Sequence, residues 1–148
     1  MKIDKTDIQI LEVLRQDAKL RVREIAKKIG KPITTVHNRI KKLQSDGVIK
    51  NYTVIVDEKK LGKLVGAFVS IEVNYDSMIE KENNQEDIAL EIKKLEGVQD
   101  VYIITGGNDL IIKVVETDID SLNNFLINKL RKIPGVAKTQ TSVILKKF

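Results

Sequence analysis

The sequence predicts an α+β protein with an N-terminal helix-turn-helix and a C-terminal ferredoxin-like domain of the order β-α-β-β-α-β. Three observations support this fold class. Residues 21–49 contain two short helical patterns on either side of a glycine. The chain becomes β-rich from residue 64, and two similar helix–glycine–strand segments follow in its second half. The length of 148 residues suits two small domains.

The helix-turn-helix is indicated by apolar residues that recur at helical spacing on both sides of Gly30. Glycine is favoured just after a helix, so Gly30 is expected to close the first of these two helices. Each helix then has one apolar face, formed by Ile25, Ala26 and Ile29 in the first and by Val36, Ile40 and Leu43 in the second. In this motif the second helix lies in the major groove of DNA.

Another helix is expected to precede the motif. Asp4 is a suitable N-cap for it, and Asp7 places negative charge in its first turn, where the helix dipole favours such charge. We expect Ile8, Leu11 and Leu14 to form its apolar stripe.

The third helix is expected to start near Pro32, whose fixed φ suits a first helical turn, and to end at Asp46 and Gly47. Residues 52–56 alternate between apolar and polar like a strand, and the charged residues 57–60 mark a boundary. We therefore assign residues 1–50 to the helix-turn-helix domain, 51–63 to a strand and linker, and 64–148 to the ferredoxin-like domain.

The third helix has a polar face opposite its apolar residues. Its candidates for base edges are Thr34, Thr35, His37, Asn38 and Lys41. Thr35 could instead only support the helix start, and His37 could be a solvated surface residue. Candidates for phosphate contacts are Arg21, Arg23, Lys28, Lys31 and Lys42. For Arg39, a phosphate contact and an ion pair to Glu24 are equally open.

Positive charge is concentrated in the first part of the chain. Residues 1–60 contain 15 Lys and Arg against 8 Asp and Glu, a net charge of +7, whereas residues 61–148 contain 11 against 13, a net charge of −2. A lysine-rich helix face is often only a solvated surface. Here it coincides with a helix-turn-helix pattern, which favours a nucleic-acid partner.

The composition gives little support to catalysis, metal binding or membrane insertion. The chain has no cysteine and one histidine, and it contains neither a nucleophile elbow nor a phosphate-binding Gly-x-x-x-x-Gly-Lys loop. The charged N-terminus does not resemble a signal peptide, and no run of about 18 apolar residues occurs. We expect a cytoplasmic, nucleoid-associated protein without a metal or bound cofactor. Its many Lys, Glu and Ile residues fit a thermophilic source.

The second half follows the split βαβ pattern. Strands are expected at residues 64–73, 98–105, 110–115 and 136–145, and helices at 86–95 and 118–132. The inward side chains of the two helices are expected to be Ile88, Ile92, Leu95, Leu122, Phe125, Leu126 and Leu130. The polar residues 74–85 are expected to form a loop, partly helical near Met78 and Ile79.

Residues 94–98 and 132–136 repeat one device, a helix end followed by a glycine turn and a strand start. An antiparallel sheet of this kind carries its helices on one face. The strand at residues 64–73 has few polar residues on either side, so its other face is expected to need cover. A two-fold homodimer is the simplest solution.

Several short motifs follow one another in a specific order and spacing. They are Ile3-Asp4-x-x-Asp7-x-x-Ile10-Leu11, Glu24-Ile25-Ala26, Thr35-Val36-x-x-Arg39-Ile40-x-x-Leu43-x-x-x-Gly47-Val48-Ile49, Leu61-Gly62 and Gly106-x-x-Asp109. Over nearly all of its length, the chain thereby resembles the leucine-responsive/asparagine-responsive (Lrp/AsnC) regulators. The resemblance implies a winged-type helix-turn-helix and a ferredoxin-like effector and oligomerisation domain, in dimers that associate into tetramers or octamers.

The resemblance also implies an amino-acid effector, of unidentified type, held between dimers. Glycine N–H groups can take its carboxylate and an aspartate its ammonium group. The candidate residues are Gly106, Gly107, Asn108, Asp109, Thr139 and Thr141. The two glycines could equally form only a hairpin turn with positive φ, and the two threonines could only pack in the sheet.

We therefore predict a sequence-specific DNA-binding transcriptional regulator, not an enzyme. Its third helices would enter major grooves of double-stranded DNA about one turn apart, at a near-palindromic operator. One alternative is an architectural protein that wraps DNA with weak sequence preference and uses the same Lys and Arg residues. Another is a ligand-binding or enzymatic ferredoxin-like protein in which the helix-turn-helix is only a docking module.

Overall fold

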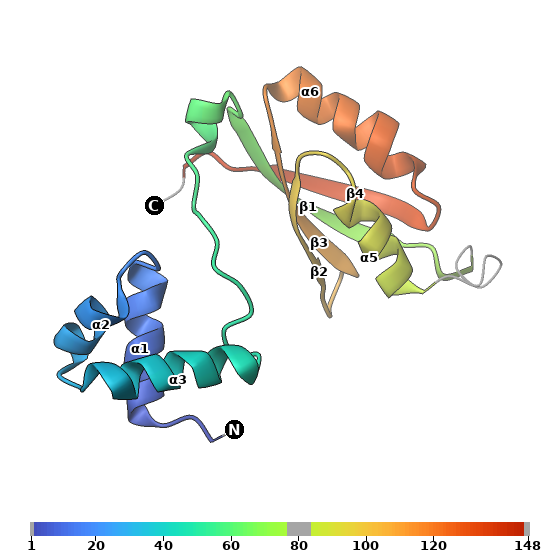
Figure 1. Ribbon diagram of the computed structural model, residues 1–148. Coiled ribbons are helices and arrows are strands. Elements are labelled where there is room, and N and C mark those ends of the chain that lie inside the picture. The colour runs from blue at the N-terminus through green and yellow to red at the C-terminus, as the bar shows by residue number, and fades with distance from the viewer. Residues whose placement is uncertain (1, 77–83, 147–148) are drawn as a thin grey trace. The chain divides into compact units, whose positions relative to one another are not determined.

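The computed structural model describes residues 2–76 and 84–146, and the chain divides into two compact units (Figure 1). The first unit ends at Ile55 and the second begins at Val56, and each has its own apolar core. Helices come first and a sheet with helices follows, which confirms the predicted α+β class. Among the described residues, no helix is long and apolar enough to cross a lipid bilayer.

The first unit consists of three helices, α1 (Lys5–Gln16), α2 (Val22–Ile29) and α3 (Ile33–Ser45). The left-handed conformation of Gly30, with a φ of 65°, ends α2 as predicted. Pro32 precedes the first residue of α3, and Asp46 follows its last. The buried core consists of Ile10, Ile25, Ala26, Val36, Ile40 and Leu43, which confirms the apolar faces predicted for α2 and α3.

The apolar stripe predicted for α1 was partly wrong. The side chain of Ile8 is 50% exposed, whereas Ile10 is completely buried. The reason is that Asp7 is also buried, so the inward face of α1 runs through positions 7, 10 and 14. Leu11 and Leu14 pack against the core as expected.

The strand expected at residues 52–56 is not formed, and this prediction was wrong. The side chains of Val54 and Ile55 are 74% and 90% exposed. An alternating sequence becomes a strand only where another strand pairs with its backbone, and the described part of the chain provides no such partner here. A short 3-10 helix, Glu58–Leu61, follows this segment.

The second unit contains a four-stranded antiparallel sheet in the order β2-β3-β1-β4. Its elements are β1 (Val65–Val73), α5 (Gln85–Lys93), β2 (Val98–Ile103), β3 (Leu110–Glu116), α6 (Ile119–Asn124) and β4 (Val136–Val143). A π-helical turn at Phe125–Lys129 and a 3-10 turn at Leu130–Lys132 continue α6, so the predicted helix at 118–132 is irregular in its second half. The predicted order β-α-β-β-α-β is confirmed. The helix expected near Met78 and Ile79 lies outside the described residues.

Helices α5 and α6 cover one face of the sheet (Figure 1). The repeated device predicted at residues 94–98 and 132–136 is present in both halves of this unit. The amide of Val98 donates to the carbonyl of Leu95, and that of Val136 donates to the carbonyl of Ile133. Each helix is therefore connected to the next strand by the same tight turn, which holds the helix against the sheet over the apolar core.

The opposite face of the sheet is more polar than expected. On β1 it carries Phe68, which is 42% exposed, together with Ser70 and Glu72. Glu72 forms an ion pair with Lys138 of β4. The prediction that this sheet is apolar on both faces is thus correct for only part of the surface.

Candidate DNA-binding helix and effector loop

Most of the side chains that helix α3 presents to solvent are polar. Its apolar residues Val36, Ile40 and Leu43 are buried, and a rotation of 100° per residue places Thr34 and Lys41 on the opposite side. The structure places the predicted base-edge candidates Thr34, His37, Asn38 and Lys41 in exposed positions and Thr35 in a half-buried one. These five side chains therefore form one surface, available to a partner.

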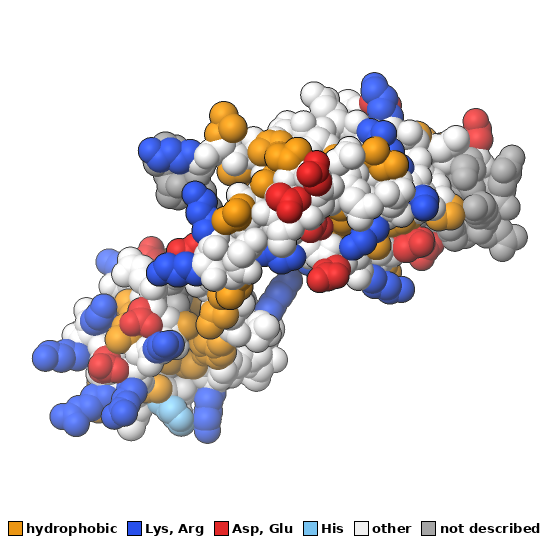
Figure 2. Space-filling view, turned by 90° about the horizontal axis from the view of Figure 1, so that it is seen from above, with side chains coloured by type: hydrophobic (Ala, Val, Ile, Leu, Met, Phe, Trp, Pro, Cys, Tyr) orange, Lys and Arg blue, Asp and Glu red, His pale blue; other side chains and the backbone are white. Residues whose placement is uncertain are grey.

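The basic residues predicted to hold phosphates are also exposed. They are Arg21, Arg23, Lys28, Lys31 and Lys42, and none of them forms an ion pair within the described part of the chain. Figure 2 shows Lys and Arg side chains spread over this helical unit, with the single histidine among them. The N-terminus of α3 has no side-chain cap, because Pro32 occupies the capping position. The surface around the start of α3 is thus positively charged and has few internal partners.

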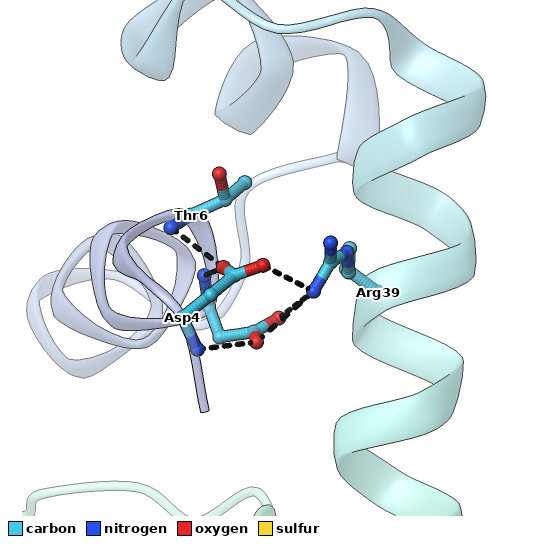
Figure 3. Close-up of polar contacts among 4 residues, drawn as sticks. Asp4, Thr6 and Arg39 are labelled. Carbon is cyan, nitrogen blue, oxygen red and sulfur yellow. Dashed lines mark hydrogen bonds and ion pairs between the residues drawn. The ribbon is translucent and has the colours of Figure 1, made fainter. Parts of the chain in front are cut away.

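Arg39 lies at the edge of the exposed face and is held by two carboxylates of α1 (Figure 3). Its Nη1 lies 2.7 Å from Oδ2 of Asp4 and 3.1 Å from Oδ2 of Asp7. The alternative ion pair with Glu24 is wrong. The Glu24 carboxylate instead accepts a hydrogen bond from the backbone N–H of Arg21, at 2.7 Å, and so caps α2.

The two aspartates also form the N-terminal cap of α1. The Asp4 carboxylate accepts the backbone N–H groups of Thr6 and Asp7, at 2.8 and 3.0 Å, and Asp7 accepts the N–H of Asp4 in return, at 3.0 Å. The hydrogen bond from the Asp7 backbone, together with the charge of Arg39, lowers the pKa of Asp4 below its usual value. Arg39, Asp4 and Asp7 thus form a clamp that connects the N-terminal cap of α1 with the middle of α3. The sequence did not reveal this role for Asp7.

The predicted effector loop connects β2 to β3 and is closed by a hydrogen bond from the amide of Ile104 to the carbonyl of Asp109, at 2.9 Å. Gly106 has a φ of 123°, a conformation that favours glycine. Gly107 does not have a positive φ, so the alternative of a turn that needs positive φ at both glycines holds for Gly106 only. Both glycines are exposed, whereas Asn108 and Asp109 are half-buried.

Asp109 already has internal partners, which the sequence gave no sign of. Its Oδ2 accepts the backbone N–H of Val73 at 2.8 Å. Its Oδ1 accepts the hydroxyl of Tyr75 at 2.5 Å and the amide of Gln85 at 3.2 Å. The hydrogen bond to Asp109 raises the pKa of Tyr75. Asp109 therefore fixes the loop to the end of β1 and the start of α5.

Thr139 and Thr141 are not brought next to this loop within one chain. Thr139 pairs with Ile71 of β1, and Ile71 pairs on its other side with Leu110 of β3, so β1 lies between them. Both threonines project to the face of the sheet that carries the helices, and the hydroxyl of Thr139 accepts a hydrogen bond from Nε of Arg131 at 3.1 Å. The two groups of effector candidates form separate surfaces in a single chain.

A helix-turn-helix with a basic exposed helix, joined to a second unit with its own core, is typical of two-domain DNA-binding regulators. Two family models match the chain accordingly. Residues 3–50 match a winged helix-turn-helix DNA-binding domain, and residues 66–148 match the Lrp/AsnC ligand binding domain. The chain belongs to the Lrp/AsnC family of transcriptional regulators. It is a DNA-binding regulator with a ligand-binding domain, not an enzyme.

Relatives of known name agree with this assignment. The chain is 38% identical over 141 residues to an uncharacterized HTH-type transcriptional regulator of Pyrococcus furiosus, covering 95% of this chain and 91% of the relative. It is 36% identical over 143 residues to the transcriptional regulator AzlB of Bacillus subtilis, covering 97% and 88%.

Solved structures of similar proteins have the same fold. LrpC of Bacillus subtilis is 32% identical and superposes with a TM-score of 0.85, covering 100% of this chain and 98% of that one. A transcriptional regulator of Neisseria meningitidis in complex with L-Met is 25% identical, with a TM-score of 0.87 and coverage of 99% and 92%.

Proposed function

We propose that this regulator recognises specific DNA sequences through the exposed face of α3. The observation that supports this proposal is the exposure of Thr34, His37, Asn38 and Lys41 opposite the buried face of the helix, with Thr35 at its edge. Asparagine can bond adenine through two hydrogen bonds and lysine can reach guanine, and each good pair discriminates by about 1–3 kcal/mol. Arg21, Arg23, Lys28, Lys31 and Lys42 would hold phosphates on either side.

Arg39 would act differently from these residues. Its guanidinium contacts the carboxylates of Asp4 and Asp7 and therefore holds α3 at a fixed angle to α1. We place it as a positioning residue rather than a primary phosphate contact.

A homodimer would present two copies of α3 to successive major grooves at a near-palindromic operator. Pairing through the open face of the sheet would cover Phe68, whose side chain is 42% exposed there. Further association would give a tetramer or octamer on the nucleoid.

The effector would be an amino acid bound at the loop from Gly106 to Asp109. The similar Neisseria regulator in complex with L-Met supports this class of ligand. Glycine N–H groups would take its carboxylate, and Asp109 and Asn108 its ammonium group. Because β1 separates Thr139 and Thr141 from the loop in one chain, these two residues would reach the same ligand only from a second chain.

A competition experiment tests the proposal. Binding to the protein's own upstream DNA would be measured against random competitor at two salt concentrations, with and without a panel of amino acids. We expect a preference of about a thousandfold or more for the specific DNA, and its loss in Asn38→Ala and Lys41→Ala but not in the control Lys132→Ala, an exposed lysine of the second unit. Equal binding to all sequences would instead favour an architectural protein, and indifference to every amino acid would remove the effector.

A further inference from the structure

Ile33 is the one exposed apolar side chain of α3. It is the first residue of the helix and is 50% exposed, and it does not belong to the core of its unit. The other exposed residues of this helix are polar or charged, Thr34 and His37 beside it included. Ile33 thus places a branched apolar group within the surface that we propose to face DNA.

The surroundings of Ile33 are concave and basic. Together with Ala26 and Pro32 it lines an open hollow of about 720 Å³, and the charged residues of the lining are Arg23, Lys27 and Lys31 against the single carboxylate of Glu24. The surplus of positive charge in this lining attracts the phosphate backbone, whereas the apolar side chain of Ile33 cannot bond a phosphate or a polar base edge. The neighbours of Ile33 suit phosphates and polar base edges, whereas Ile33 itself suits an apolar group on the DNA.

The 5-methyl group of thymine is the apolar feature of the major-groove base edges. Residues at the N-terminal end of a recognition helix contact base edges. A β-branched side chain in a helix is already restricted in χ1, so it loses little conformational freedom when it makes a contact. We infer that Ile33 reads a thymine methyl group and contributes to the sequence preference of this regulator. The inference rests on the proposed role of α3 as the DNA-reading helix.

The experiment removes the thymine methyl group from the DNA and the side chain of Ile33 from the protein, first separately and then together. The probe is a duplex selected from a random library by the wild-type protein, in which each thymine is replaced in turn by uracil. Dissociation constants would be measured for the wild type, Ile33→Ala and Ile33→Val. We expect at least one position where uracil weakens wild-type binding about fourfold, the effect of losing one buried methyl group. At that position Ile33→Ala should show no further loss, and Ile33→Val should keep the dependence on the methyl group.

A matched control is provided by Ile8, which is also 50% exposed but lies on α1. Ile8→Ala should retain the wild-type response to uracil, and thermal unfolding followed by circular dichroism checks that every variant is folded. If Ile33→Ala responds to uracil as the wild type does at every position, or if the wild type responds at none, the inference is overturned. Asn38→Ala keeps the two claims apart, because weakened binding in that variant supports α3 as the reader whatever the uracil scan gives.

Discussion

Replacing Asp7 by asparagine removes the charge from the one polar side chain that is buried in the described part of the chain. Asparagine has nearly the same size, so the core around Ile10 keeps its packing. The change affects two interactions at once. The carboxylate accepts the N–H of Asp4 at 3.0 Å and the Nη1 of Arg39 at 3.1 and 3.3 Å.

The loss in the free energy of unfolding depends on which partners Arg39 keeps in the variant. Breaking a buried ion pair costs about 3–5 kcal/mol when the partner is left buried and unpaired. Arg39 is not left in that state, because its side chain is 37% exposed and keeps Asp4 at 2.7 Å. The loss is then closer to that of one charge-assisted hydrogen bond, about 2 kcal/mol in the free energy of unfolding. For a unit of this size such a loss corresponds to a fall in Tm of roughly 10 °C.

Chemical denaturation followed by helical circular dichroism would measure this loss. Asp4→Asn is the matched comparison, since asparagine is as good an N-cap as aspartate and the site is partly exposed. We expect a much smaller loss there. Equal stability of Asp7→Asn and the wild type would refute the view that the clamp between α1 and α3 stabilises the first unit. A stable variant that nevertheless lost its preference for specific DNA would show that the clamp acts on the angle of α3 alone.

Three further predictions concern the loop between β2 and β3 and the N-terminal cap of α1. Gly106→Ala should destabilise the second unit by about 1–3 kcal/mol in chemical denaturation because of its positive φ, whereas Gly107→Ala should be neutral, since an added Cβ there meets no atom within 4 Å. In spectrophotometric titration, Tyr75 should ionise above the usual pH of about 10, and Asp109→Asn should lower the pH at which it ionises, because the hydrogen bond with Asp109 raises the pKa of Tyr75. Asp4 has a lowered pKa in the folded protein, so its stabilising effect is complete above the ordinary carboxyl range and should be lost as the pH falls through that lowered value; acid unfolding of Asp4→Asn should lack this component.

The features predicted correctly from the sequence are those that depend on local periodicity. The buried faces of α2 and α3 follow from the spacing of Ile25, Val36 and Leu43, and the order of strands and helices follows from alternation and from the glycine turns. These patterns involve residues close together in the sequence. A helix or strand that buries one face needs apolar residues at its own period, so the pattern is present whatever the rest of the fold.

Three features that periodicity does not predict depend on partners that are distant in sequence. Periodicity predicts a buried Ile8, because no residue near it indicates that Asp7 turns inward to meet Arg39, 32 residues later. Residues 52–56 alternate correctly for a strand but have no described strand beside them. Tyr75 and Asp109 are separated by 34 residues and meet only because β1 and β3 are paired. Pairwise contacts of this kind are set by topology, which periodicity does not contain.

The composition of the surface that we propose to face DNA shows why exposure has to be considered before residue type. By type alone, Arg39 is the best phosphate ligand of α3 and Ile33 the worst DNA contact. In the structure, the guanidinium of Arg39 is held by two carboxylates, and its charge is balanced within the protein. Ile33 is half exposed at the N-terminal end of α3. In recognition helices, the residues at this end contact base edges. A guanidinium that must first leave Asp7 gains little from a phosphate, whereas an apolar side chain already in water gains from any methyl group that covers it. The salt dependence of binding should accordingly reflect the free lysines and arginines of this unit and not Arg39, since only a cation without an internal partner releases a counterion when it meets DNA.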